Sequence, residues 1–267
     1  MTDRAREKRT VREAFDGAAA SYDSAARVQR EICHRLAAFA GAQPPPPGAT
    51  RVVDAGCGTG YGLGLLEQLC PGATSIALDF APAMLAHLAA DTLAGAEPLR
   101  LCADLEAIPL ATASVDAIWS SLALQWCEPG AALREFVRVL RPGGGAWIAT
   151  LGPRTLHELR DAFATIDDAD HVIGFQPLDR WLGEAAAAGF ELRASNEAPA
   201  FALAADLRSL LRDIKAIGAH SVGPQRRRRP LGRAAWRQLE TRYESHRRDD
   251  GLLPATYDVI LLALEKP

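Results

Sequence analysis

The sequence predicts an α/β fold in which helices cover both faces of a doubly wound, mostly parallel sheet of seven strands. From residue 51 onward, short runs rich in Val, Ile and Leu alternate with longer amphipathic stretches, as expected for buried parallel strands joined by helices. A glycine-rich turn follows the first of these runs. Right-handed crossovers between successive strands then give a doubly wound sheet.

A helical segment is predicted before the sheet. Apolar residues recur at helical spacing over residues 10–20 and 24–40. Gly41 ends the second helix, and the four prolines at 44–47 fit neither a helix nor a central strand. We therefore expect a helical N-terminal lid segment over residues 1–47 and a main domain over residues 48–267.

The main domain alternates strands with helices. Strands are predicted at residues 51–55, 75–79, 99–103, 115–120 and 146–151, and helices at 62–69, 83–93 and 131–140. A helix at 177–188 and strands at 191–202 and 257–264 resume the pattern. Residues 152–176 and 204–255 exceed a minimal sheet, and we expect both insertions above the carboxyl ends of the strands, where such folds bind ligands.

Composition excludes several classes of protein. With a net charge of −3 over 267 residues the chain lacks the broad basic surface of a nucleic-acid binder. It has no apolar run of 18 residues, so we expect no membrane span, and its charged start is unlike a secretory signal. The five scattered cysteines suit a reducing cytoplasm and form no C-x-x-C pair. The six histidines form no H-E-x-x-H pair, so no metal site is expected.

The most informative stretch is Val-Val-Asp-Ala-Gly-Cys-Gly-Thr-Gly at residues 52–60, because it leaves a predicted strand and enters a predicted helix. Gly56, Gly58 and Gly60 admit positive φ and the close approach of a ligand to the backbone. The helix N-terminus behind them offers N–H groups to an anion. Glycines also suit any tight turn between a strand and a helix, so this loop alone does not identify a ligand.

Two acidic residues after the glycine loop add evidence for a nucleoside cofactor. Asp79 ends the second predicted strand about 20 residues after Gly60, a spacing at which an acid binds a cofactor ribose. Asp104, followed by Leu105, ends the third predicted strand, where the edge of a base would lie. The alternative for each acid is an ordinary cap on the next helix or turn.

Asp54, which leads the glycine loop, bears on the choice of cofactor. A carboxylate at this position would repel the pyrophosphate of a nicotinamide dinucleotide. S-adenosylmethionine instead presents an ammonium and a sulfonium cation along with its carboxylate. The pattern therefore favours a methyl donor, and hydride transfer with a nicotinamide cofactor is the alternative.

Taken together, residues 54–60, Asp79, Asp104-Leu105 and residues 120–126 resemble a class I S-adenosylmethionine-dependent methyltransferase, a Rossmann-like fold. Nearly the whole chain is similar to the malonyl-[acyl-carrier protein] O-methyltransferases of biotin synthesis. The segments that carry this resemblance are residues 15–23, 121–127, 155–160, 215–220 and 253–257.

The resemblance implies O-methylation of the free carboxyl of a malonyl thioester on acyl-carrier protein, with S-adenosylmethionine as cofactor. The residues expected to bind the cofactor are Tyr22, Asp54, Gly56, Gly58, Gly60, Asp79, Asp104, Leu105 and Ser120. Gln125 and Trp126 are expected to wall the substrate pocket, and the catalytic candidates are Tyr22, Arg154 and Lys215.

The chain also departs from the family pattern. Many relatives have an Asn-Arg pair where this chain has Ile173 and Gly174, so another group must meet the substrate if that arginine holds its carboxylate. A mitochondrial relative associated with arginine hydroxylation shares residues 155–160 and 254–257. Methylation of another small acid, and a donor-binding assembly factor without methyl transfer, are therefore further alternatives.

The expected chemistry needs little proton transfer. A malonyl carboxylate is ionised at pH 7, so positioning and exclusion of water should supply most of the rate. One or two basic or hydroxyl donors are expected to orient the carboxyl. The run Arg226, Arg227, Arg228 and Arg229 would dock an acidic carrier protein, the alternative being a solvated loop.

Overall fold

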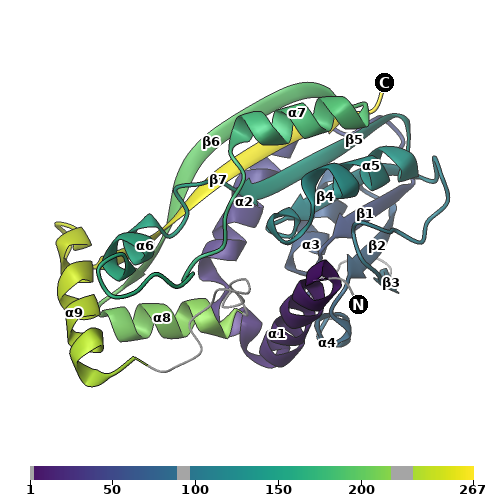
Figure 1. The fold of residues 1–267 in the computed structure, drawn as a ribbon. Helices are drawn as coiled ribbons and strands as arrows, with labels where there is room; N and C mark the ends of the chain where they lie inside the picture. Colours follow the sequence, from purple (N-terminus) through teal and green to yellow (C-terminus); the bar gives the residue numbers. More distant parts are fainter. Residues whose placement is uncertain (1–2, 89–96, 218–230) are drawn as a thin grey trace.

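The computed structural model describes residues 3–88, 97–217 and 231–267, which form a seven-stranded sheet with helices on both faces (Figure 1). The strand order is β3-β2-β1-β4-β5-β7-β6. The strands are β1 (Arg51–Ala55), β2 (Thr74–Asp79), β3 (Leu99–Cys102), β4 (Val115–Ser121), β5 (Leu140–Leu151), β6 (Glu191–Ala204) and β7 (Leu253–Glu265). Strands β1 to β5 pair in parallel, and β7 runs antiparallel to both β5 and β6. The predicted doubly wound, mostly parallel sheet is confirmed.

Two apolar layers hold the sheet. On one face, α2 (Arg27–Gly41) and α3 (Tyr61–Leu69) bury residues such as Ile32 and Leu66 against Trp119 and Trp147. On the other, α5 (Pro129–Val139) and α7 (Leu178–Ala188) bury Phe136 and Trp181. Gly189, with φ +102°, ends α7 as a left-handed C-cap. The parallel strands are covered on both faces, which explains their continuous apolar runs.

The helix α1 (Asp3–Ala25) lies across the carboxyl ends of β2 and β3 and contacts the short α4 (Pro82–Ala86). Sequence periodicity predicts a helix over residues 10–20, and the structure shows a longer one that breaks at Ala26. Asp16 Oδ1 accepts a hydrogen bond of 2.9 Å from the Ala83 N–H. The Thr59 hydroxyl donates to Asp23 Oδ1 at 2.9 Å. These polar contacts fix α1 above the glycine loop.

A third apolar cluster lies beyond the carboxyl edge of the sheet. It joins α6 (His157–Phe163), α8 (Leu207–Ala216) and α9 (Arg233–Tyr243) to the end of β6 and the start of β7. Leu151, the last residue of β5, pairs with Val259, so the first part of β7 extends past β5. The described parts of both inserted stretches therefore stand on the carboxyl side of the sheet, at the lower left of Figure 1.

Across the described ranges, no helix combines the length and apolar character needed to span a membrane.

Candidate active site

Three cavities meet at the carboxyl edge of the sheet, and Tyr22 and Leu122 line all three. The loop cavity, about 40 Å³, is lined by the glycine loop and α2. The strand-end cavity, about 70 Å³, lies under α1 at the ends of β2 and β3. The large cavity, about 750 Å³, lies between α1, α6 and α8. The first two cavities contain most of the predicted cofactor residues, and the large one contains the predicted substrate wall.

Asp54 supplies an unused buried acid to the loop cavity. Its side chain is buried, and among the described residues its Oδ2 has no hydrogen-bond partner. Burial, together with the nearby Asp79 carboxylate, raises the pKa of Asp54 to about 8. A Cβ on Gly62 would lie 2.8 Å from this Oδ2, so glycine is needed beside it. An orphaned buried carboxylate fits a cationic ligand group such as the ammonium of S-adenosylmethionine.

Arg30, which is not among the predicted site residues, supplies a cation to the same cavity. Its Nη2 lies 3.3 Å from Asp23 Oδ1, its guanidinium stacks 5.0 Å from the Tyr61 ring centroid, and its buried Nε has no partner among the described residues. The loop cavity thus offers an acid and a guanidinium, which match the ammonium and carboxylate of an amino acid. The position of Arg30 after the Tyr22-Asp23 pair was the available signal.

The glycine loop leaves space for a ligand at Gly58. Gly58 has φ +54°, lines both small cavities, and a Cβ added there would meet no protein atom within 4 Å. Its N–H donates to Asp79 Oδ2 at 2.9 Å. A Cβ on Gly56 would lie 2.2 Å from the Ala123 Cβ. Gly60 lines neither small cavity; it begins α3 with φ +89° and packs against Leu88.

The strand-end cavity is lined by Asp79, Asp104 and Leu105. Asp104 Oδ1 accepts from the Glu106 N–H at 3.0 Å, which is the turn-capping alternative, but Asp104 also faces the cavity. Lys8 on α1 lies 2.5 Å from Asp104 Oδ2 and 2.8 Å from Glu106 Oε2. The first turns of α1 therefore close over this cavity by ion pairs.

Ser120 lies outside all three cavities, in contrast to its predicted cofactor role. Its buried hydroxyl donates to the Ala55 carbonyl at 2.8 Å, inside the sheet between β4 and β1. Ser121 lines both small cavities instead. Successive side chains of a strand point to opposite faces, so a shift of one residue decides which serine reaches the ligand.

The large cavity is lined by the predicted wall residues Gln125 and Trp126 and by Lys215. The Trp126 ring packs edge-on against Phe15 on α1, with centroids 5.6 Å apart. Leu122 and Leu156, with φ of +57° and +54°, also line it. Two non-glycine residues in the left-handed region at one cavity indicate backbone strain stored at a functional site.

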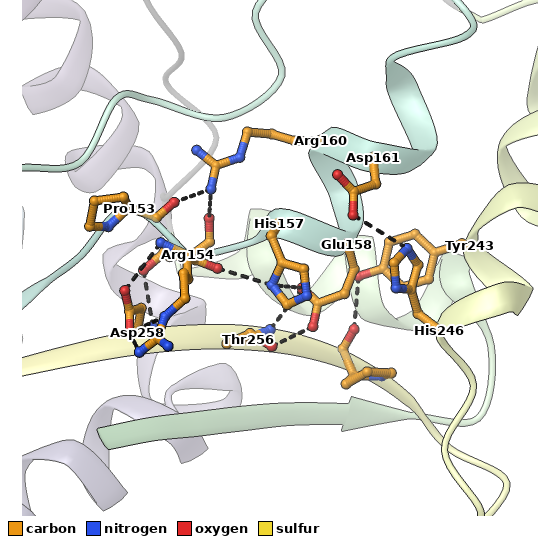
Figure 2. A network of polar contacts seen from close by, with 12 residues as sticks. Pro153, Arg154, His157, Glu158, Arg160, Asp161, Tyr243, His246, Thr256 and Asp258 are labelled. Carbon is orange, nitrogen blue, oxygen red and sulfur yellow. Dashed lines mark hydrogen bonds and ion pairs between the residues drawn. The ribbon is translucent and has the colours of Figure 1, made fainter. Parts of the chain in front are cut away.

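Arg154 does not line the large cavity, and the structure does not support its predicted catalytic role. Figure 2 shows its guanidinium turned to Asp258 on β7, with Nη2 2.6 Å from Oδ1, while its backbone N–H donates to Oδ2 at 3.1 Å. The Arg154 side chain is 68% exposed and that of Asp258 is 3% exposed. Arg154 therefore serves as the counter-charge of a buried acid.

The same network anchors α6 on β7 (Figure 2). The buried Glu158 accepts hydrogen bonds from the N–H and the hydroxyl of Thr256. The Asp258 N–H donates to the Thr155 hydroxyl at 3.1 Å. Thr155 and Leu156 line the large cavity, so this network sets the position of one cavity wall.

Ile173 lines the large cavity, and Gly174 does not. The basic side chains among the described lining residues are His171 and Lys215. His171 Nε2 lies 2.7 Å from Asp167 Oδ1, and its ring stacks on Phe163 at 3.4 Å between centroids. In the part of the chain that the structure describes, no group of three His, Cys, Asp or Glu side chains could hold a metal ion.

Comparison with known proteins shows the family to which the chain belongs. The family model described as "Methyltransferase domain" matches residues 53–148. The chain is 45% identical to a malonyl-[acyl-carrier protein] O-methyltransferase of Laribacter hongkongensis, over 95% of this chain and 88% of the relative. It is 42% identical to that of Dechloromonas aromatica, over 97% and 95%. A biotin biosynthesis bifunctional protein of Cellvibrio japonicus is 38% identical, with 98% of this chain matched to 51% of that protein.

Solved structures support the fold. A putative methyltransferase from Bacillus halodurans superposes with a TM-score of 0.61 at 15% identity, covering 86% of this chain and 98% of that one. The orphaned Asp54, the Arg30 guanidinium and the open space at Gly58 fit the amino-acid part of S-adenosylmethionine, which sets the nicotinamide alternative aside. The chain belongs to the malonyl-[acyl-carrier protein] O-methyltransferase family and is an S-adenosylmethionine-dependent O-methyltransferase.

Proposed function

We propose that this enzyme methylates the free carboxyl of a malonyl thioester on acyl-carrier protein, an early step of biotin synthesis. The observation that carries the proposal is the junction of the large cavity with both small cavities at Tyr22 and Leu122. An acceptor in the large cavity meets the donor at this junction. Relatives up to 45% identical carry the name of this activity.

The donor residues divide between the two small cavities. In the loop cavity, Asp54 holds the donor ammonium and Arg30 its carboxylate. In the strand-end cavity, Asp79 receives the ribose hydroxyls, while Asp104 and Leu105 border the base. S-adenosylmethionine supplies an electrophilic methyl group on a sulfonium cation.

The protein positions the acceptor and excludes water. The acceptor carboxylate is ionised at pH 7, so no general base is required. Phe15 and Trp126 line both the large and the strand-end cavities. Their apolar rings keep water away from the place where the two cavities meet. Burial raises the pKa of the Tyr22 hydroxyl, which therefore stays protonated and able to donate a hydrogen bond.

Helices α1 and α8 close over the acceptor. The Ser21 hydroxyl donates to the Ala216 carbonyl at 3.1 Å, which ties the end of α1 to the last turn of α8. Lys215 stands in that turn and lines the large cavity. Residues 1–47 act as the lid segment in this proposal, together with the insertions 152–176 and 204–255, and Lys215 attracts the anionic acceptor.

We assign carrier-protein docking to the arginine-rich surface of the second insertion, residues 204–255. Arg226, Arg227, Arg228 and Arg229, the predicted docking residues, lie outside the described residues. Support comes from the neighbouring helices, where exposed arginines stand at positions 208 and 212 of α8 and 233, 237 and 242 of α9. An acidic carrier protein would be steered to such a surface. We place the reaction in the cytoplasm, consistent with five free cysteines.

Transfer of a labelled methyl group tests the proposal. Purified enzyme, methyl-labelled S-adenosylmethionine and malonyl-acyl-carrier protein should give a labelled methyl ester. Alkali should hydrolyse this ester and release labelled methanol. Donor binding without any ester would favour the assembly-factor alternative. Equal turnover of free malonate without carrier protein would favour a small-acid methyltransferase.

A further inference from the structure

The reacting carboxylate must lie where the large cavity meets the loop cavity. With the amino-acid part of the donor in the loop cavity and its nucleoside in the strand-end cavity, the sulfonium between them would offer its methyl group where the cavities join. The residues shared by the large and loop cavities are Tyr22, Gln29 and Leu122. Leu122 is apolar, which leaves Tyr22 and Gln29 as the polar side chains at this point.

Gln29 is joined to a second polar residue of the cavity wall. It is buried on α2, and its side chain lies within reach of a hydrogen bond to the hydroxyl of Tyr257 on β7. Tyr257 is 6% exposed and lines the large cavity. Both residues stand in the core layer formed by α2, β7 and their neighbours, so packing fixes their positions.

The pair is uncharged and retains donors for a ligand. Burial raises the pKa of Tyr257 to about 12, so its hydroxyl keeps its proton at neutral pH. A glutamine amide has two N–H donors. After one of them bonds Tyr257, the other N–H and the tyrosine O–H match the two oxygens of a carboxylate.

Neutral donors suit this reaction better than a cation. The acceptor carboxylate loses its charge as the methyl group arrives, so a cation held against it would stabilise the ground state more than the transition state. The basic lining residues His171 and Lys215 do not line the loop cavity; Tyr257 does not line it either, but its contact with Gln29 joins it to the point where the cavities meet. Building on the proposed function, we infer that Gln29 and Tyr257 are the positioning pair that holds the acceptor carboxylate through uncharged hydrogen bonds.

Two substitutions test the pair. Tyr257→Phe keeps the ring and removes the hydroxyl, and Gln29→Met keeps the length and removes the amide. Each should lower kcat/KM for malonyl-acyl-carrier protein about 10- to 100-fold, mainly through KM, because a hydrogen bond to a charged group is lost. The affinity of Tyr257→Phe for S-adenosylhomocysteine, measured by calorimetry, should stay within about threefold.

Tyr243→Phe is the matched control. Tyr243 is also buried, and its hydroxyl donates to the Pro254 carbonyl at 2.9 Å, but it does not line the large cavity. This variant should lose thermal stability and keep the wild-type KM. If Tyr257→Phe folds with the KM of Tyr243→Phe while the wild type makes ester, the inference is wrong. If the wild type makes no ester, the proposed function itself fails.

A double variant adds a second readout. Both side chains donate hydrogen bonds to one carboxylate. The loss of transition-state free energy, from kcat/KM, in the double variant Tyr257→Phe with Gln29→Met should therefore be smaller than the sum of the two single losses. Gln29→Glu places a second carboxylate at the junction and should raise the acceptor KM further than Gln29→Met. Strict additivity, or a Gln29→Glu enzyme as active as wild type, would overturn the pairing.

Discussion

The charge of Asp54 depends on what occupies the loop cavity. Burial raises its pKa to about 8, so at pH 7 the free protein holds this carboxyl mostly protonated. An adjacent ammonium favours the ionised form and lowers the pKa again. Donor binding at neutral pH should therefore release a proton from Asp54.

Calorimetry in buffers of different ionisation enthalpy measures this proton. We expect a release approaching one proton per donor at pH 7 and little at pH 9, where Asp54 is already ionised. Asp54→Asn should weaken donor binding and abolish the release. Asp116→Asn is the control, because hydrogen bonds from Thr50, Arg51 and Arg141 hold the pKa of Asp116 at about 2 despite partial burial. A buffer-independent heat for the wild type would refute the assignment.

Gly58 should be essential for donor binding and Gly72 should not. Both have positive φ and open space at the Cβ position, but only Gly58 lines the donor cavities. Gly58→Val should reduce donor affinity more than 100-fold, since its side chain occupies ligand space. Gly72→Val carries the same backbone strain and should bind the donor normally. Equal affinities for the two folded variants would count against the site.

At the residue scale, the sequence predicts the groups whose chemistry is local. Gly56, Gly58, Asp79 and Asp104 stand at or just after strand ends, and they line the small cavities, whereas Gly60 does not. Gln29, Arg30 and Tyr257 sit within ordinary helix and strand patterns. The roles of Gln29 and Tyr257 depend on the packing of α2 against β7, which no local pattern reveals.

Among the elements, α1 is the one whose attachment to the rest of the protein salt should weaken most. Its first turns are held by Lys8 on Asp104 and Glu106, and by Arg4 on Glu106. Partly exposed ion pairs contribute roughly 0.5–1 kcal/mol each and weaken with salt. Lys8→Met should therefore speed the release of bound S-adenosylhomocysteine several-fold. Added salt should reduce the difference in release rate between this variant and the wild type.

Stopped-flow measurement of product release checks this expectation. Arg9→Met is the matched control, because the exposed Arg9 pairs with Glu13 on the same helix and, within the described residues, forms no ion pair with another element. The Arg9 variant should release product at the wild-type rate. Identical rates for the two variants would mean that these ion pairs do not hold the lid.

Arg154 should prove structural through its contact with Asp258. Arg154→Met leaves the buried Asp258 without its counter-charge, so the melting temperature should fall. Because Arg154 does not line the large cavity, the KM for the acceptor should stay near the wild-type value. A variant with normal melting and a strongly raised acceptor KM would restore the catalytic interpretation.

At the element scale, all seven strands are predicted, and β1 has its predicted bounds, but β5 and β7 begin earlier than predicted. The Pro254 in β7 argues against a central strand, so the sequence predicts a start at Tyr257. The structure starts β7 at Leu253 because this portion extends beyond β5 and pairs with β6 alone, where a missing N–H is tolerated. β5 likewise begins at Leu140 through a register shift against β4, whereas the sequence predicts a helix over residues 131–140 and a strand only from residue 146.

For the molecule as a whole, charge should govern the encounter with the carrier protein. Replacing Arg226, Arg227, Arg228 and Arg229 with serine should raise the acceptor KM most at low salt, by about tenfold, since steering falls with ionic strength. Donor affinity should not change. Arg193→Ser, which removes an exposed arginine of β6, is the control. An unchanged KM and salt dependence would end the docking proposal.

The antiparallel β7 has a consequence for how activity arises during synthesis. Tyr22 comes from the first helix and Tyr257 from the last strand of the sheet, yet both line the large cavity. Such distant contacts form late because loop closure precedes them. The glycine loop and both nucleoside-facing acids precede β7 in the chain. A nascent polypeptide should therefore gain the ability to bind S-adenosylmethionine before it can methylate the acceptor.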